Sequence, residues 1–176
     1  MCSTFRYLIF ILTLSTLFAC RHRQPKPITE EEYHKTRQHM AEVNKILVER
    51  DRQRIMGWLN RNNQEMTETK TGLWYRIDRQ GDGPPAETGK TAVINYKVSL
   101  LDGKVCYDSK TAGPKKFRIG QGGVESGLEE GILMLRQGSE ATFIMPPHLA
   151  YGLPGDGDKI PARAIILYQV EVIAIE

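Results

Sequence analysis

The stretch that decides the fold is residues 91–108, which read TAVINYKVSLLDGKVCYD. Five apolar positions in it alternate with mostly polar ones: Ala92, Ile94, Tyr96, Val98 and Leu100. A period of two is typical of a strand that is buried on one face, here the face that carries Tyr96. Asp102-Gly103 predicts a tight turn after this strand, so that Val105 and Tyr107 return beside it.

The segments that follow predict a small antiparallel sheet around one short helix. Residues 73–77 and 117–119 are typical of short strands, and residues 164–175 of an apolar terminal strand. Ser126 followed by Glu129 is a capping box, which predicts a helix start, and we expect this nearly buried helix to end near Gly138. Sheet and helix together predict a shallow apolar cup into which several aromatic side chains point.

The composition is that of a globular protein with a substantial core, because 40% of the residues are hydrophobic and 26% are charged. A net charge of +3, without a basic stripe interleaved with aromatics, argues against a nucleic-acid partner. Cys2, Cys20 and Cys106 are too few and too scattered for a disulfide framework or a zinc site. We therefore expect no metal and no cofactor, and we expect Cys106 to be buried.

Residues 1–19 have the pattern of a bacterial lipoprotein signal peptide. Arg6 gives a positive start, and the apolar run of residues 7–18 is too short for a bilayer span of about 20 residues. The run ends in Leu17-Phe18-Ala19-Cys20, which resembles a lipoprotein box in which the thiol of Cys20 takes the lipid. An uncleaved anchor or an ordinary secretory signal is the alternative. The favoured interpretation predicts an acylated Cys20, palmitate included, on a membrane of the bacterial cell envelope, facing the periplasm.

After a proline-containing tether, residues 20–28, we expect a helical arm over residues 29–66. Thr29 and Glu32 form a capping box, and one narrow apolar stripe follows: Tyr33, Met40, Val43 and Leu47. Two interpretations are open. The arm is a solvated spacer that docks its Trp58 end on the domain, which we favour, or its stripe pairs with a second copy to form a homodimer.

Several motifs resemble the FKBP-type peptidyl-prolyl cis-trans isomerases, in order and with the spacing of that family. They are Asp102-Gly103, Tyr107-Asp108-Ser109, Val124, Gly127-Leu128-Glu129-Glu130-Gly131, Ala150-Tyr151-Gly152 and Ile160-Pro161. The resemblance covers residues 90–176, the expected isomerase domain, after a linker and first strand at 67–89. The lipoprotein start, the arm and residues 71–75 further resemble gliding-motility-associated FKBP-type lipoproteins. The family implies an α+β fold, with a curled antiparallel sheet of five or six strands around one short helix, here preceded by a long N-terminal helix.

The resemblance also implies which residues form the site, between sheet and helix. Tyr96, Asp108 and Tyr151 take the catalytic positions, and the substrate-binding positions are Tyr107, Phe117, Val124, Glu125, Leu128, Ile160 and Tyr168. Leu128 is expected to form the floor of the pocket. The hydroxyl of Tyr151 and the backbone amide of Glu125 are expected to meet substrate carbonyls.

The implied reaction is cis-trans isomerisation of X-Pro bonds in proline-containing polypeptides during protein folding. Breaking amide resonance gives this rotation a barrier of about 18–20 kcal/mol. An apolar pocket disfavours the planar, dipolar amide relative to the twisted one, so no general acid, base or nucleophile is needed.

Four departures from better-known family members suggest a more polar pocket. The floor is Leu128 rather than tryptophan, Glu125 is charged, Lys115 replaces an aromatic residue, and Asp156 stands where histidine is common. Two functions are therefore open: an active isomerase, or a catalytically weak chaperone or binding module in a membrane-associated secretion or motility complex. An open pocket would favour catalysis, whereas Lys115, Glu125 or the 153–159 loop inside it would favour binding.

Overall fold

The structure is a computed structural model that describes residues 29–176. The predicted signal peptide, the tether and Cys20 lie outside the described residues. The described residues fall into two units that divide between Ala41 and Glu42. The first helix of the described part, α2 (Glu30–Arg61), begins in the first unit and continues into the second. Thr29 and Glu32 cap its start as expected, because each backbone amide donates to the other's side chain, at 3.1 and 3.3 Å.

The second unit contains an antiparallel sheet with seven strands within the described residues. These are β1 (Thr67–Glu68), β2 (Trp74–Arg79), β3 (Thr91–Leu100), β4 (Val105–Asp108), β5 (Lys115–Arg118), β6 (Glu140–Met145) and β7 (Ile166–Ile175). Their order is β1-β2-β6-β7-β3-β4, and β5 pairs with β3. The predicted α+β fold is confirmed. The strand number of five or six was too low, because the two-residue strand β1 adds to the edge of β2 and β5 shares β3 with β4.

The hairpin of β3 and β4 forms as the sequence predicts. Gly103 takes a φ of 92°, which favours glycine, and the Lys104 amide donates to Asp102 at 2.9 Å. The register then shifts, since Val98 pairs with Tyr107 and Ser99 with Val105. Cys106 is therefore the extra residue of a β-bulge, and it is buried as expected.

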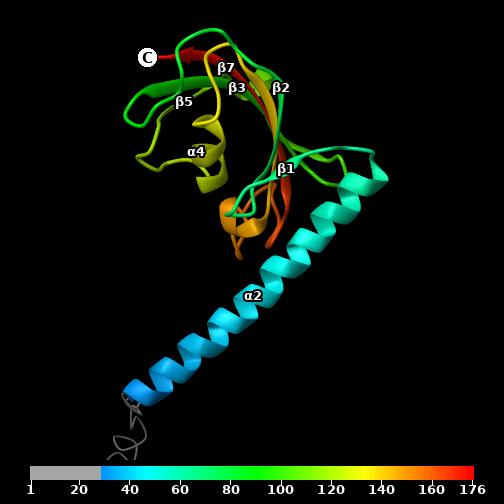
Figure 1. The fold of residues 1–176 in the computed structure, drawn as a ribbon, viewed down its shortest axis with the longest axis vertical. Helices are drawn as coiled ribbons and strands as arrows, with labels where there is room; N and C mark the ends of the chain where they lie inside the picture. Colours follow the sequence, from blue (N-terminus) through cyan, green and yellow to red (C-terminus); the bar gives the residue numbers. More distant parts are fainter. Residues whose placement is uncertain (1–28) are drawn as a thin grey trace, which may run out of the picture. The chain divides into compact units, whose positions relative to one another are not determined.

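The short helix α4 (Ser126–Ile132) lies on the concave side of the curled sheet (Figure 1). It comes so close to β6 that a Cβ at Gly131 would stand 2.6 Å from the ring of Phe143. The predicted capping box was wrong: Ser126 lies inside the helix, and Glu129 instead accepts the amides of the loop before it, Gly122 among them at 3.1 Å.

The helix α4 also ends earlier than Gly138, the expected end. Leu135 donates back to Ile132 in a tight turn, and the carbonyl of Leu135 then accepts the amide of Ala86 at 3.0 Å. Pairing with the loop before β3 thus pulls the chain out of the helix. Two further one-turn helices, α3 (Ser109–Ala112) and the 3-10 helix η2 (Pro147–Leu149), complete the unit.

The C-terminal half of α2 docks on the sheet, as expected for the Trp58 end of the arm. A second apolar cluster holds the docked half in place: Ile55, Leu59, Trp74, Ile144 and Ile165. The indole of Trp58 donates to the carbonyl of Leu101 at 2.8 Å. Because α2 covers this face, β6 is buried on both sides and not only on its alternating apolar side.

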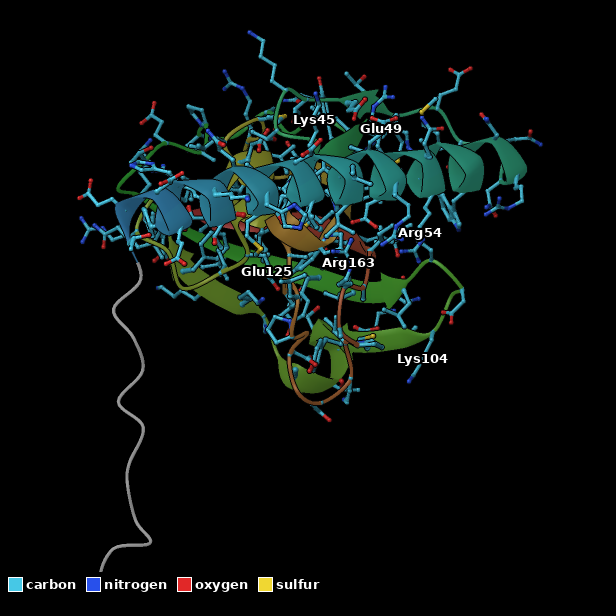
Figure 2. All side chains as sticks on the ribbon, turned by 90° about the horizontal axis from the view of Figure 1, so that it is seen from below. Lys45, Glu49, Arg54, Lys104, Glu125 and Arg163 are labelled. Atoms are coloured by element: carbon cyan, nitrogen blue, oxygen red, sulfur yellow. The ribbon has the colours of Figure 1, made fainter. Side chains whose placement is uncertain are left out.

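A buried ion pair accompanies this apolar contact. Asp51 is only 3% exposed, and its carboxylate lies 2.7 Å from the guanidinium of Arg163. Arg54 approaches the same carboxylate at 3.5 Å, on the side of α2 on which Arg163 lies (Figure 2). In contrast, Lys45 and Glu49 are exposed. Among the described residues, no helix is long and apolar enough to cross a membrane.

Replacement of Ile55 by alanine tests the docking of α2. Ile55→Ala should lower the free energy of unfolding by about 2–5 kcal/mol, because the fully buried side chain leaves a cavity. Urea unfolding of residues 21–176 measures it. Ile46→Ala is the matched control on the same helix, since Ile46 is 63% exposed, and should change the value by less than about 0.5 kcal/mol. Equal effects of the two substitutions would show that α2 does not contribute its docked face to stability.

Candidate active site

Two tyrosines from neighbouring strands form the wall of the predicted cup. Val98 of β3 pairs with Tyr168 of β7, which places Tyr96 diagonally next to Tyr168 on the same face. The ring centroids are 5.9 Å apart and the rings are tilted by 34°. Leu128 from α4 is fully buried in the same cluster, as a floor would be.

The ammonium of Lys115 lies over both of these rings. Its Nζ is 5.0 Å from the centroid of Tyr96 and 5.5 Å from that of Tyr168, within the range of cation–π attraction. Lys115 begins the edge strand β5, opposite Ile94 of β3, so its side chain starts beside the cup. The sequence raised Lys115 as a residue that could fill the pocket, and the structure places it there.

Glu125 brings a carboxylate to the same place. It is 7% exposed, its Oε1 accepts a hydrogen bond from the hydroxyl of Tyr151, and its Oε2 lies 3.6 Å from the Lys115 ammonium. A surface depression of about 330 Å³ runs along the residues around this pair: Lys115, Gly123, Val124, Glu125, Ala150 and Tyr151. In the described structure the Tyr151 hydroxyl therefore donates its hydrogen bond to Glu125 and not to a substrate.

Both inward-facing phenols are held in their neutral form. Burial, followed by the hydrogen bond to Glu125, raises the pKa of Tyr151 well above its usual range. Burial also raises the pKa of Tyr168, and the negative charge of Glu125 adds to the effect. Both hydroxyls thus remain hydrogen-bond donors over the whole physiological pH range. Within the described residues the Tyr168 hydroxyl has no hydrogen-bond partner.

The remaining wall is fixed by Asp156. This carboxylate accepts a hydrogen bond from the hydroxyl of Tyr107 and the amides of Asp158 and Ile160, at 2.9 and 2.8 Å. The hydrogen bond raises the pKa of Tyr107 to about 12, and burial adds to it. Lys159 covers the Tyr107 ring, with its Nζ 5.0 Å from the centroid. The loop after Tyr151 is thus closed onto β4.

The structure brings most of the expected site residues into one cluster. Partly exposed members pack against the cluster from outside: Tyr96, Tyr107, Val124 and Tyr151. Buried members pack beneath them: Phe117, Leu128, Ile160 and Tyr168. Asp108 is a different case, because its carboxylate accepts the Lys110 amide at 2.8 Å and so caps α3. Its catalytic role, like the other roles in the site, stays a prediction.

Sequence reasoning missed two features of the site. It assigned Glu125 a contact through its backbone amide and did not expect its carboxylate to hold Tyr151. It noted Asp156 only as a departure and missed its bond to Tyr107. The available signal was an acid in the loop after Tyr151, but its pairing with Tyr107 on β4 spans 49 residues, which local patterns do not fix.

A curled antiparallel sheet packs its aromatic side chains, Tyr96 and Tyr168 among them, against one short helix that carries Leu128. A family model described as FKBP-type peptidyl-prolyl cis-trans isomerase matches residues 83–173, just over half of the 176 residues. The chain therefore belongs to the FKBP-type peptidyl-prolyl cis-trans isomerases.

Several bacterial relatives carry the same family name. The chain is 38% identical over 108 residues to a probable FKBP-type isomerase, FkpA, of Neisseria meningitidis, covering 61% of this chain and 39% of that protein. It is 35% identical over 109 residues to FkpA of Escherichia coli, with the same coverage. The chain thus spans about two fifths of the length of these curated relatives.

Two solved structures have a similar fold. The crystal structure of FkpA from Escherichia coli matches with a TM-score of 0.63 and 28% identity, over 96% of this chain and 81% of that one. The crystal structure of AtFKBP13 matches with a TM-score of 0.60 and 33% identity, over 64% of this chain and 99% of that one. The resemblance to gliding-motility lipoproteins stays a prediction.

The Asp156→Asn substitution tests the contact that closes the loop. It removes the negative charge beside Tyr107, so the pKa of this phenol should fall from about 12 towards 10. A pH titration of ¹³C-labelled tyrosine by NMR, with Tyr107→Phe to assign the signal, measures the pKa. Because the folded-state pKa is raised, the contact stabilises the fold fully below about pH 10 and loses this contribution as the pH approaches 12.

Asp158→Asn is the matched control for that titration. The Asp158 carboxylate lies 3.5 Å from the same hydroxyl, farther than that of Asp156, so its neutralisation should lower the pKa less. A larger drop in Asp158→Asn than in Asp156→Asn would show that the assignment of the contact is wrong.

Proposed function

We propose that the chain is a peptidyl-prolyl cis-trans isomerase that assists the folding of proteins outside the cytoplasm. The observation that supports this most is the aromatic cup of Tyr96 and Tyr168 over Leu128, with a neutral phenol, Tyr151, at its edge. Membership of the isomerase family supports the same activity.

The cup would act by preferring the twisted amide. A proline ring seated against the ring faces and Leu128 would bring its X-Pro bond into an environment with few competing water molecules. The twisted amide has lost resonance and part of its dipole, so it loses less on leaving water than the planar amide does. Preference for this form over the planar one is sufficient to accelerate the reaction.

The polar groups of the site would orient the substrate. The hydroxyl of Tyr151 and the backbone amide of Glu125 would donate to substrate carbonyls and fix the peptide on both sides of the proline. For this, Tyr151 must exchange its bond to the Glu125 carboxylate for one to the substrate. Lys115 must also move from the two ring faces that the proline would contact.

The position of Lys115 and Glu125 in the structure supports a second candidate function. Lys115 and Glu125 occupy the edge of the cup in the way that was expected of a binding module rather than of an open catalytic pocket. A chaperone, or a fixed component of a membrane-associated secretion or motility complex, would need only a surface that holds extended chains.

An isomerase assay separates the two candidates. The measurement is NMR exchange of X-Pro peptides with residues 21–176, with the wild type beside Tyr151→Phe and Leu128→Ala. Tyr151→Phe removes one hydrogen bond to the substrate and should lower kcat/KM about tenfold. Leu128→Ala removes the floor and should lower it further, with the fold checked by circular dichroism.

Tyr33→Phe is the matched control for the hydroxyl deletion. Tyr33 lies on the arm and is 57% exposed, so kcat/KM should stay at the wild-type value. A well-folded wild type that accelerates no peptide would end the isomerase proposal and leave the binding module.

The pattern around Cys20 supports a lipid anchor that places the protein on a membrane of the cell envelope, facing the periplasm. With an acylated Cys20, Cys20→Ser should move the full-length protein from the membrane fraction to the supernatant and abolish incorporation of labelled palmitate. If the variant stayed in the membrane fraction and still incorporated palmitate, another segment would be the anchor.

A homodimer through the arm is the last part of the proposal. The exposed Tyr33 and Met40 of α2 support it, and sedimentation velocity of residues 21–176 would decide it.

A further inference from the structure

The edge of the cup has the composition of a cation-binding site. Two aromatic faces, those of Tyr96 and Tyr168, lie 5.0 and 5.5 Å from the Lys115 ammonium, and the Glu125 carboxylate lies 3.6 Å from it. Ring faces carry negative potential, so two rings and a carboxylate together attract one cation strongly. We call these three acceptors, Tyr96, Tyr168 and Glu125, the cation cage.

The cage is not fully satisfied by Lys115. At 3.6 Å the ammonium is too far from Oε2 of Glu125 for a hydrogen bond, and within the described residues this buried oxygen has no other partner. The buried hydroxyl of Tyr168 also lacks one. A buried carboxylate that is only partly paired lowers the stability of the fold. A cation that comes closer to it would reduce this cost.

Lys115 is placed so that it can leave the cage. Its side chain is 25% exposed, and it starts from β5, which pairs only with β3 among the described strands. A long, flexible ammonium at the end of an edge strand can turn outward into water without disturbing the sheet. Glu125 lacks this freedom, because its side chain is only 5% exposed, and in the free protein Tyr151 also holds its Oε1.

From this asymmetry we infer that Glu125, the carboxylate of the cage, selects prolines flanked by lysine or arginine, whose side chain replaces Lys115 beside it. The inference rests on the proposed function, because it assigns a substrate class to the same cup. When a proline ring displaces Lys115 from the two ring faces, a neutral flanking residue leaves the buried Glu125 charge without its cation. A basic flanking residue places a new cation beside Glu125 in place of Lys115. An acidic flanking residue places a second negative charge beside Glu125.

The test compares peptides that differ only in charge next to proline. The peptides are acetyl-Ala-Xaa-Pro-Yaa-amide, with Lys, Arg, Ala or Glu at one flank and Ala at the other. For each, chemical-shift titration of residues 21–176 gives Kd and NMR exchange gives kcat/KM. At one flank or the other, peptides with Lys or Arg should bind about tenfold more tightly than the peptide with Ala, and the peptide with Glu should bind most weakly. These differences in Kd should become smaller at high salt.

Three variants assign the ranking to the cage. Glu125→Gln should bring the Lys-to-Ala ratio of Kd values close to one, because the buried charge is gone. Lys115→Met should increase the ratio, since only the substrate can then supply the cation. Lys116→Met is the matched control, because its neighbouring ammonium pairs with Glu176 on the surface, and the ratio should stay as in the wild type.

Each outcome separates this inference from the proposed function. Equal Kd and kcat/KM for all charges, with clear acceleration, would overturn the inference and leave the isomerase. Charge-ranked Kd values without acceleration would support the cage and end the isomerase proposal. A ranking that survives in Glu125→Gln would place the selection elsewhere on the surface and overturn the inference, and binding of no peptide would overturn both.

Discussion

The long antiparallel pairing of β3 with β7 is the interaction on which the rest of the structure depends. It runs from Ala92 opposite Ile175 to Leu100 opposite Ile166, so it ties the start of the domain to its end. The same register puts Tyr96 and Tyr168 side by side on the concave face. A slip of one residue in either strand would turn its own tyrosine away from the other one, so the core and the site are specified by one constraint.

Different helices cover the two faces of this sheet. The face under α4 carries the candidate site, and the face under α2 supports the fold. On the concave face α4 approaches β6 closely because Gly131 has no side chain, and Leu128 is buried in the same cluster as the two rings. On the other face α2 buries Ile55 and pairs Asp51 with Arg163. The support is therefore apolar contact plus one buried ion pair, whereas the charges of the cup, Lys115 and Glu125, lie at its edge.

The sequence predicted the features that repeat or follow a local rule. The alternation in β3, the turn at Gly103 and the capping box at Thr29 are all found. The features it could not predict depend on contacts between distant segments. Glu129 caps no helix because the loop amides before α4 compete for it, and Asp156 finds Tyr107 only after the sheet has closed. Local pattern therefore determined the elements, and tertiary contact determined how their polar side chains were used.

Glu125 shows why such a tertiary contact matters for function. An apolar side chain in its place would avoid burying a charge and would add to the core, so stability alone does not account for this residue. Its carboxylate instead holds Tyr151 in a neutral, orientated form and draws Lys115 over the aromatic faces. The free protein thus keeps the ammonium of Lys115 over the two ring faces. In the proposed function, this ammonium would shield the rings from water until a substrate chain displaces it. On that proposal, the buried charge of Glu125 would be part of how the site works and not a defect of an apolar pocket.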